Sequence, residues 1–259
     1  MKIGLTLSGG GARGIAHLGI LKALEEKGLK PEMISGVSSG AIVGALYAAG
    51  LKPEQILATL LKPRMFKYFR PAWSKFGLLN MQRLIPIYKL YLPCLTFEEL
   101  KIKLIISAAD LKEGKTIYFD SGNLIEPILA SACIPLLFAP FVYGEKRLVD
   151  GGVINNLPVE PLIGKVDFLI GAHVNPNNPN FEVTSIKSMV ERTFNLSVGC
   201  NVKPRKDYCD LFIEPQSLCK YRIFDLGKAE EIFNIGYEGA LEAICKNEKL
   251  ESFLKQRLK

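Results

Sequence analysis

Short apolar runs alternate with stretches of helical periodicity along most of this chain. Apolar runs of strand length occupy residues 2–7, 33–36, 102–109, 115–120, 147–150, 167–174 and 209–214. Helical patterns fill residues 12–28, 39–50, 53–61, 124–131, 184–198 and 228–246, and a charged tail continues to Lys259. This alternation predicts an α/β protein, a three-layer α/β/α fold in which helices cover both faces of a mostly parallel central sheet.

The composition is that of one folded unit. The chain has 259 residues, of which 48% are hydrophobic, and this is ample for a single domain around a buried sheet. No internal repeat and no low-complexity linker divides the chain, so we predict one domain over residues 1–259. No apolar stretch reaches the roughly 18 residues that indicate a transmembrane helix.

The N-terminus and the cysteines bear on the cell compartment. The first predicted strand begins at Lys2, which leaves no room for a signal peptide. The six cysteines contain no C-x-x-C pair, which argues against a structural zinc site. Without an export signal they are expected to be free thiols in a reducing compartment. We therefore expect a cytoplasmic protein.

Two glycine-rich motifs each follow a predicted strand and precede a predicted helix. The first is Gly-Gly-Gly-Ala-Arg-Gly at 9–14, and the second is Gly-Val-Ser-Ser-Gly at 36–40. Two helix N-termini on neighbouring strands direct free backbone N–H groups into one crevice. One motif presents a serine hydroxyl and the other presents only donors. A nucleophile that faces an anion-stabilising loop is the minimal apparatus for acyl transfer.

The first motif has an alternative interpretation as a dinucleotide site. Gly9, Gly11 and Gly14 fit the G-x-G-x-x-G pattern between a strand and a helix. That site also needs an acidic residue at the end of the second strand, and Glu32 precedes this strand instead. The second motif beside the first makes a dinucleotide site less favoured. The sequence leaves open the alternative of a non-catalytic protein that binds an anionic lipid or a nucleotide in the same crevice.

The serine of the second motif is placed as a nucleophile would be. A catalytic serine of this pattern occupies a sharp turn from strand to helix, and Gly36 and Gly40 remove side chains that would collide there. The alternative is that Ser38 only caps the helix that follows. We favour the nucleophile.

The chain offers few bases to activate Ser38, because it has only two histidines. His17 lies in the first predicted helix and is expected to serve packing. His173 ends an apolar run, and it would complete the order Ser, Asp, His of many hydrolases. Asp150 also ends a short strand, in Asp-Gly-Gly at 150–152, and a buried carboxylate with a raised pKa can take the serine proton directly. The alternative for this tripeptide is a tight turn.

The motifs at 9–14, 36–40 and 150–152 resemble, in order, the three motifs of the patatin-like phospholipases. The segments at 130–135 and 155–158 are similar to those around the aspartate of that family. The resemblance is anchored over residues 3–158. It implies a patatin-like fold, and a phospholipase A or lysophospholipase type of acyl hydrolase that acts on phospholipids or other fatty-acyl esters.

The resemblance also implies roles for individual residues. Ser38 would be the nucleophile and Asp150 the base of a dyad that needs no catalytic histidine, metal or cofactor. The oxyanion hole would be formed by the backbone N–H groups of three glycines, together with an arginine: Gly9, Gly10, Gly11 and Arg13. The glycines that complete the motifs are Gly14, Gly36, Gly40, Gly151 and Gly152.

Residues 62–76 differ from the regular alternation. They hold five basic residues, five aromatic residues and no acid, and they include the only tryptophan, Trp73. This mixture is typical of a segment that contacts an anionic membrane surface or acts as a lid. The alternative is a structural loop that buries its aromatic side chains over the active-site crevice. The same mixture can also bind single-stranded nucleic acid, but no nucleic-acid partner is expected. The net charge of +7 favours an anionic partner only through long-range attraction.

Overall fold

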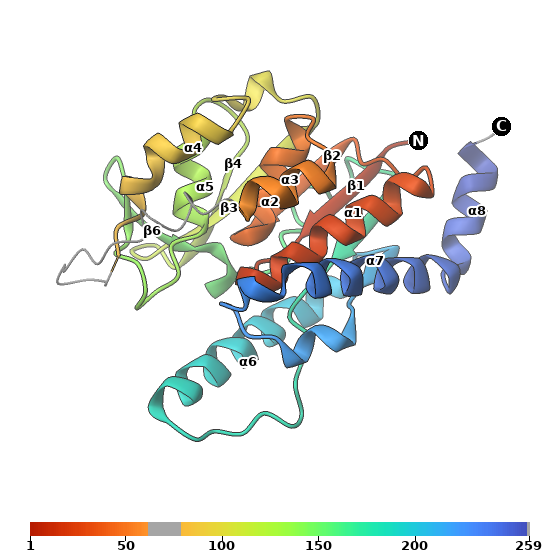
Figure 1. The fold of residues 1–259 in the computed structure, drawn as a ribbon. Coiled ribbons are helices and arrows are strands. Elements are labelled where there is room, and N and C mark those ends of the chain that lie inside the picture. Colours follow the sequence, from red (N-terminus) through yellow and green to blue (C-terminus); the bar gives the residue numbers. More distant parts are fainter. Residues whose placement is uncertain (62–78, 258–259) are drawn as a thin grey trace.

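The computed structural model describes residues 1–61 and 79–257. Within them, an eight-stranded sheet forms the centre of the molecule (Figure 1). Its strands are β1 (Ile3–Leu7), β2 (Met33–Val37), β3 (Lys103–Asp110), β4 (Lys115–Phe119), β5 (Phe141–Tyr143), β6 (Lys146–Asp150), β7 (Phe168–Ala172) and β8 (Leu211–Ile213). The order is β5-β6-β3-β2-β1-β7-β8, and β4 also pairs with β3.

Most strands of the sheet are parallel, as predicted. Strands β3, β2, β1, β7 and β8 run in one direction, and Leu5 of β1 lies opposite Ile34 of β2 and Ile170 of β7. The other three strands are antiparallel to their neighbours. Short turns explain the pairs β3–β4 and β5–β6, since strands joined by a few residues can only form a hairpin, whereas β6 reaches β3 through a long connection. Gly114 and Gly144 have positive φ in the β3–β4 and β5–β6 turns.

Helices cover both faces of the sheet. They are α1 (Ala16–Glu26), α2 (Ser39–Ala48), α3 (Pro53–Leu60), α4 (Ile85–Tyr91), α5 (Ile125–Ser131), α6 (Ile186–Lys206), α7 (Ala229–Cys245) and α8 (Glu248–Arg257). Helices α1 and α7 lie side by side (Figure 1). They approach closely because Gly236 has no side chain: a Cβ there would lie 2.7 Å from the carbonyl carbon of Ala16.

Alternate residues of the strands enter two separate cores. The larger core lies under α1, α2, α5 and α7 and takes up Leu5, Ile34 and Ile170. The smaller core lies on the opposite face, where Leu169 packs against Val202 of α6 and against the irregular segment 154–166. Side chains of a strand point alternately to the two faces of the sheet. Because both faces are covered here, the central strands carry few polar residues. The predicted mostly parallel sheet flanked by helices is confirmed.

Several element boundaries differ from the prediction. Strand β5 and helix α4 were not expected, and α6 continues to Lys206 through Pro204 in its last turn. The charged tail forms α8, in which Phe253 is buried with its ring 4.7 Å from that of Phe168. A few apolar residues among many charges give a weak helical pattern, and packing on β7 decides the structure.

Two expectations concern membranes. The basic and aromatic segment 62–76 lies outside the described residues. Among the helices that the structure describes, none combines the length and the hydropathy needed to cross a bilayer.

Candidate active site

Strand β3 brings the second and third motifs together. Its Ser107 lies opposite Val37, the last residue of β2, and its Ala108 lies opposite Asp150, the last residue of β6. The two strand ends touch, since a Cβ on Gly151 would lie 2.8 Å from Cγ2 of Val37. The sheet therefore places the residue after β2 beside the residue that ends β6.

The Ser38 hydroxyl lies close enough to the Asp150 carboxylate to lower the pKa of that carboxyl, and both residues line one crevice. Both side chains are buried, with 5% and 2% of their surface exposed. Oδ1 of Asp150 accepts a hydrogen bond from the Gly152 N–H at 2.8 Å. Burial raises the pKa of Asp150 to about 6, and the neighbouring Ser38 hydroxyl and Gly152 N–H oppose this shift. A carboxylate of this pKa in contact with a hydroxyl is suited to accept its proton near neutral pH.

The backbone of Ser38 is held in an unusual conformation. Its φ of 54° and ψ of −123° are rarely adopted by a residue with a side chain. The Ser38 N–H donates to Oγ of Ser131 at 2.8 Å, and that hydroxyl donates to the Ser107 carbonyl at 2.7 Å. The Ser38 side chain makes no hydrogen bond to the N-terminus of α2. The structure therefore gives no support to the alternative of a helix cap.

The remaining motif glycines lie where backbones approach closely. A Cβ on Gly36 would lie 2.7 Å from the Gly40 carbonyl oxygen, and one on Gly151 would lie 2.7 Å from the Ser107 carbonyl oxygen. A Cβ on Gly14 would overlap the first residue of α2. These glycines let the strand ends and the two helix starts meet around Ser38.

The glycine loop lies against Ser38. A Cβ on Gly9 would lie 2.9 Å from Cβ of Ser38. The Gly9 N–H already donates to Oδ1 of Asn156 at 3.2 Å. Among the described residues, no hydrogen bond uses the N–H groups of Gly10 or Gly11. Of the three predicted backbone donors, these two are thus available to a ligand in the crevice.

Arg13 is a buried cation without an acidic partner. It is 4% exposed, and its Nη2 donates to Oδ1 of Asn195 on α6 at 3.2 Å. Its buried Nε has no hydrogen-bond partner, and no described carboxylate forms a salt bridge with it. Burial lowers the pKa of Arg13 to about 10, well above neutrality, so the side chain stays charged.

Neither histidine forms a hydrogen bond with Ser38 or Asp150 in the described structure. Nε2 of the fully buried His17 donates to the Ser8 carbonyl at 2.8 Å, and burial lowers the pKa of His17 to about 4. Nδ1 of His173 lies 2.8 Å from Oε1 of Glu214. In the described part of the chain, neither ring has a hydrogen bond to Ser38. The structure thus brings serine and aspartate together without an imidazole between them.

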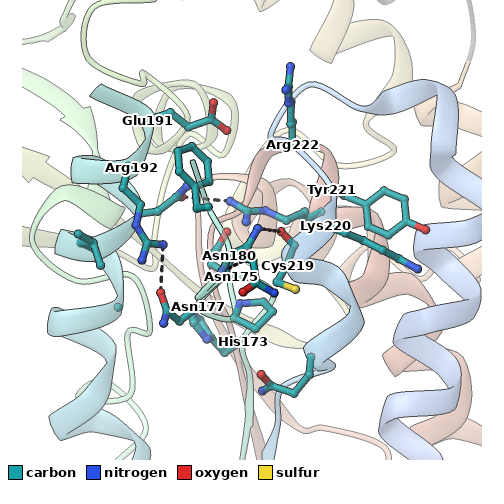
Figure 2. A pocket seen from close by; sticks show the side chains of 18 of the residues that line it. His173, Asn175, Asn177, Asn180, Glu191, Arg192, Cys219, Lys220, Tyr221 and Arg222 are labelled. Atoms are coloured by element: carbon teal, nitrogen blue, oxygen red, sulfur yellow. Dashed lines mark hydrogen bonds between the residues drawn. The ribbon is translucent and has the colours of Figure 1, made fainter. Parts of the chain in front are cut away.

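Two large cavities adjoin the crevice that holds Ser38 and Asp150. The first, here called the apolar cavity, has a volume of about 460 Å³ and is lined by Ser38 and by apolar side chains that include Ile42, Val43, Leu84, Leu137 and Phe138. The second, here called the polar cavity, has a volume of about 880 Å³ and lies between α6 and the segment 216–222 (Figure 2). Volumes of this size are typical of sites for small molecules.

Three supporting side chains were not assigned a role from the sequence. Asn156 holds Gly9, Ser131 holds Ser38, and Nδ2 of Asn175 donates to the Gly9 carbonyl. Asn175 had a usable signal: it follows the carboxyl end of β7, which is the parallel neighbour of β1.

A family model described as patatin-like phospholipase matches residues 5–163. The chain belongs to the patatin-like phospholipase family. The matched range contains Ser38, Asp150, the glycine loop and Asn156, but it ends before His173 and Asn175. Ser38 and Asp150 thus both lie within the range that the family model matches.

Two curated relatives carry NTE names. An uncharacterized NTE family protein of Mycobacterium bovis is 32% identical over 203 residues, which cover 74% of this chain and 56% of that protein. Lysophospholipase NTE1 of Kluyveromyces lactis is 30% identical over 271 residues, which cover 91% of this chain and 18% of that protein. The chain thus spans about half the length of the first relative and far less of the second.

A solved structure shares the fold. The crystal structure of VipD from Legionella pneumophila matches with a TM-score of 0.57 and 15% sequence identity, over 95% of this chain and 67% of that one. At this identity the likeness concerns the fold alone.

Proposed function

We propose that this patatin-like protein is a serine hydrolase that cleaves acyl esters of lipids, with Ser38 as the nucleophile and Asp150 as the base. The observation that carries the proposal is the placement of the two side chains beside each other in one buried crevice. A relative that is itself described as a lysophospholipase supports a lipid as the substrate. No histidine, metal or cofactor takes part in the proposed reaction.

The reaction proceeds in two halves. Asp150 accepts the Ser38 proton while Oγ bonds to the ester carbonyl carbon, and the carbonyl electron pair moves to oxygen to form the tetrahedral oxyanion. When this pair returns, the bond to the alcohol oxygen breaks and Asp150 gives its proton to the leaving alcohol. Water then attacks the acyl-enzyme in the same way and releases the fatty acid and free Ser38.

The N–H groups of Gly10 and Gly11 stabilise the oxyanion. They are free of protein partners in the described structure, whereas the Gly9 N–H is bonded to Asn156. Arg13 lines the same crevice and adds a positive charge. Removing one donor of an oxyanion hole costs about 2.7–4 kcal/mol of the barrier, so the conformation of this loop matters as much as the base.

The acyl chain of the substrate occupies the apolar cavity. This cavity begins at Ser38 and continues along Ile42 and Val43 of α2 to Leu84 and Leu137. Burying a methylene group there contributes about 0.8 kcal/mol, so a long chain binds much better than a short one.

Exposed apolar side chains near the apolar cavity support peripheral contact with a lipid surface. Leu61 and Phe224 line the cavity and are 38% and 56% exposed, and Leu136 beside it is 72% exposed. A lipid would then enter the cavity without crossing water. Vesicle sedimentation tests this: Leu136→Asn, which suits the positive φ at this position, should bind vesicles more weakly than Leu111→Asn on a distant turn. Equal binding by both variants would remove Leu136 from the contact.

The alternative is a protein that binds an anionic lipid or a nucleotide without turnover. A fluorophosphonate probe separates the two, because it bonds covalently only to an activated serine. We expect the intact protein and Ser39→Ala to be labelled, with the adduct mapped by mass spectrometry to Ser38, and Ser38→Ala to stay unlabelled. Ser39 is a matched control, since its buried hydroxyl has no hydrogen-bond partner. An unreactive Ser38 in the folded protein would favour the binding protein.

A further inference from the structure

The polar cavity carries an excess of positive charge. Six cationic side chains line it: Arg13, Arg192, Lys203, Lys206, Lys220 and Arg222. The lining holds only three carboxylates: Glu182, Glu191 and Glu214. No described carboxylate forms a salt bridge with any of the six cations. The cavity is therefore suited to an anion.

The cations come from opposite walls. Figure 2 shows Arg192 on α6 on one side and Lys220 and Arg222 on the segment that follows β8 on the other. Nη1 of Arg192 donates to Oδ1 of Asn177 at 3.1 Å, so its guanidinium is positioned without being neutralised. Glu214 on the same cavity is engaged by His173 and by Gln216. Amide groups of neighbouring asparagines add further hydrogen-bond donors.

Arg13 connects this cavity to the catalytic crevice. It lines both, as do Asn175 and Asn195. A buried charge is normally paired, but the guanidinium of Arg13 has a buried Nε without a partner and an amide as its sole acceptor among the described residues. Arg13 is therefore available to an anion in the polar cavity.

The crevice also adjoins the apolar cavity, with which it shares Ser38 and Ile134. The crevice that holds Ser38 thus adjoins both an apolar cavity and a cationic cavity. A glycerophospholipid has the same two parts on either side of its ester bond. A hydrocarbon chain is attached to the carbonyl carbon, and a phosphate-bearing alcohol is attached to the ester oxygen.

We propose that the polar cavity binds the phosphate of a glycerophospholipid substrate while the acyl chain lies in the apolar cavity. This inference rests on the proposed function and specifies its substrate class. Guanidinium groups suit the phosphate because they donate two parallel hydrogen bonds to its oxygens. The cavity thereby selects phospholipids over neutral acylglycerols.

The test compares two substrates with the same acyl chain, oleoyl lysophosphatidylglycerol and oleoyl monoacylglycerol. The measured quantity is the ratio of their kcat/KM values, below the concentration at which either forms micelles. In the double variant Arg192→Gln, Arg222→Gln we expect this ratio to fall by about tenfold or more, mainly through KM of the phospholipid. Glutamine keeps a hydrogen-bonding group, and a thermal melt verifies that the variant is folded. Lys27→Gln, Lys30→Gln makes the same change of charge at exposed sites outside both cavities.

The outcomes separate this inference from the proposed function. A ratio that is unchanged in the arginine variant, or that falls equally in the lysine control, overturns phosphate binding in the polar cavity. Absence of hydrolysis of both substrates by the intact protein refutes the proposed function instead. Calorimetry with Ser38→Ala gives a measurement without turnover: glycerol 3-phosphate should bind, and the two arginine substitutions should abolish the binding. Inorganic phosphate could bind as tightly as glycerol 3-phosphate while the ratio of kcat/KM values stays unchanged in the arginine variant. This result would assign the cavity to a free anion and overturn the proposal that it binds a phospholipid headgroup.

Discussion

The Asn156 side chain bonds both polar groups of the Gly9 backbone. Its Oδ1 accepts from the Gly9 N–H at 3.2 Å, and its Nδ2 lies 3.4 Å from the Gly9 carbonyl oxygen. The Asn156 N–H in turn donates to Oδ1 of Asn201 on α6 at 2.9 Å. A loop fixed in this way keeps its free N–H groups directed at the crevice before a substrate arrives, and such preorganisation is a main source of catalytic power.

We therefore expect Asn156→Ala to lower kcat by about a hundredfold and to change KM little. The loss arises because the loop can turn its donors away from the oxyanion. Steady-state kinetics on a soluble ester measures it, and the rate of fluorophosphonate labelling should fall in parallel. Asn201→Ala, one contact further from the crevice, should have a smaller effect on kcat. A loss confined to KM in Asn156→Ala would mean that the residue binds substrate and does not position the loop.

Asp150 should govern the pH dependence of turnover. Its pKa lies at about 6, and only the ionised carboxylate accepts the Ser38 proton, so kcat/KM should fall as pH is lowered through this value. Asp150→Asn should be nearly as inactive as Ser38→Ala, and its residual rate should lack the inflection. The profile of p-nitrophenyl butyrate hydrolysis measures both. An inflection near 6 that persists in Asp150→Asn but disappears in His173→Gln would make the histidine the base.

The ionised carboxylate of Asp150 should lower the stability of the folded protein. Burial raises its pKa from 3.8 to about 6, so the protonated form is favoured in the folded state. The stability that this protonation contributes is complete below about pH 3.8 and is lost as pH rises through about 6. We expect Asp150→Asn to be more stable than the intact protein by about 3 kcal/mol at pH 8, and by little at pH 4. Urea unfolding at the two pH values measures this, and a gain that is equal at both would assign it to another cause.

The apolar cavity should set the length of the acyl chain. Ile42 lies one helical turn beyond Ser38 and lines the cavity, so a larger side chain there shortens the available space. In Ile42→Trp, the ratio of kcat/KM for a dodecanoyl ester to that for a butyryl ester should fall by about tenfold or more. Leu90→Trp, at an exposed position of α4, is the matched control. An unchanged ratio in Ile42→Trp would place the chain elsewhere.

The proximity of Ser38 and Asp150 could be predicted from sequence because Ser38 follows one strand of the sheet and Asp150 ends another. Parallel strands end at a common edge, so Ser38 after β2 and the glycine loop after β1 had to be close. The position of Asp150 depends on the antiparallel strand β6, and the order of motifs in the family was needed to pair it with Ser38. The site residues of the sequence analysis stay predictions of role, while the structure supplies their proximity.

The roles of Ser131 and Asn156 and the existence of the two cavities could not be predicted from the sequence. Ser131 ends the predicted helix 124–131 and Asn156 lies in an irregular segment, and their partners are set by how α5 and that segment pack on the sheet. The cations of the polar cavity are spread from Arg13 to Arg222, so no local pattern announced them. Their convergence depends on α6 lying opposite the segment after β8, a tertiary arrangement that local preferences do not determine.

The central claim is that Ser38 carries out acyl transfer. Its most direct test is the release of fatty acid from a lysophospholipid by the intact protein, Ser38→Ala and Ser39→Ala, each verified as folded by circular dichroism. We expect the intact protein and Ser39→Ala to turn over at similar rates, and Ser38→Ala to show no release above the uncatalysed reaction. Substantial hydrolysis by a folded Ser38→Ala protein would contradict the account.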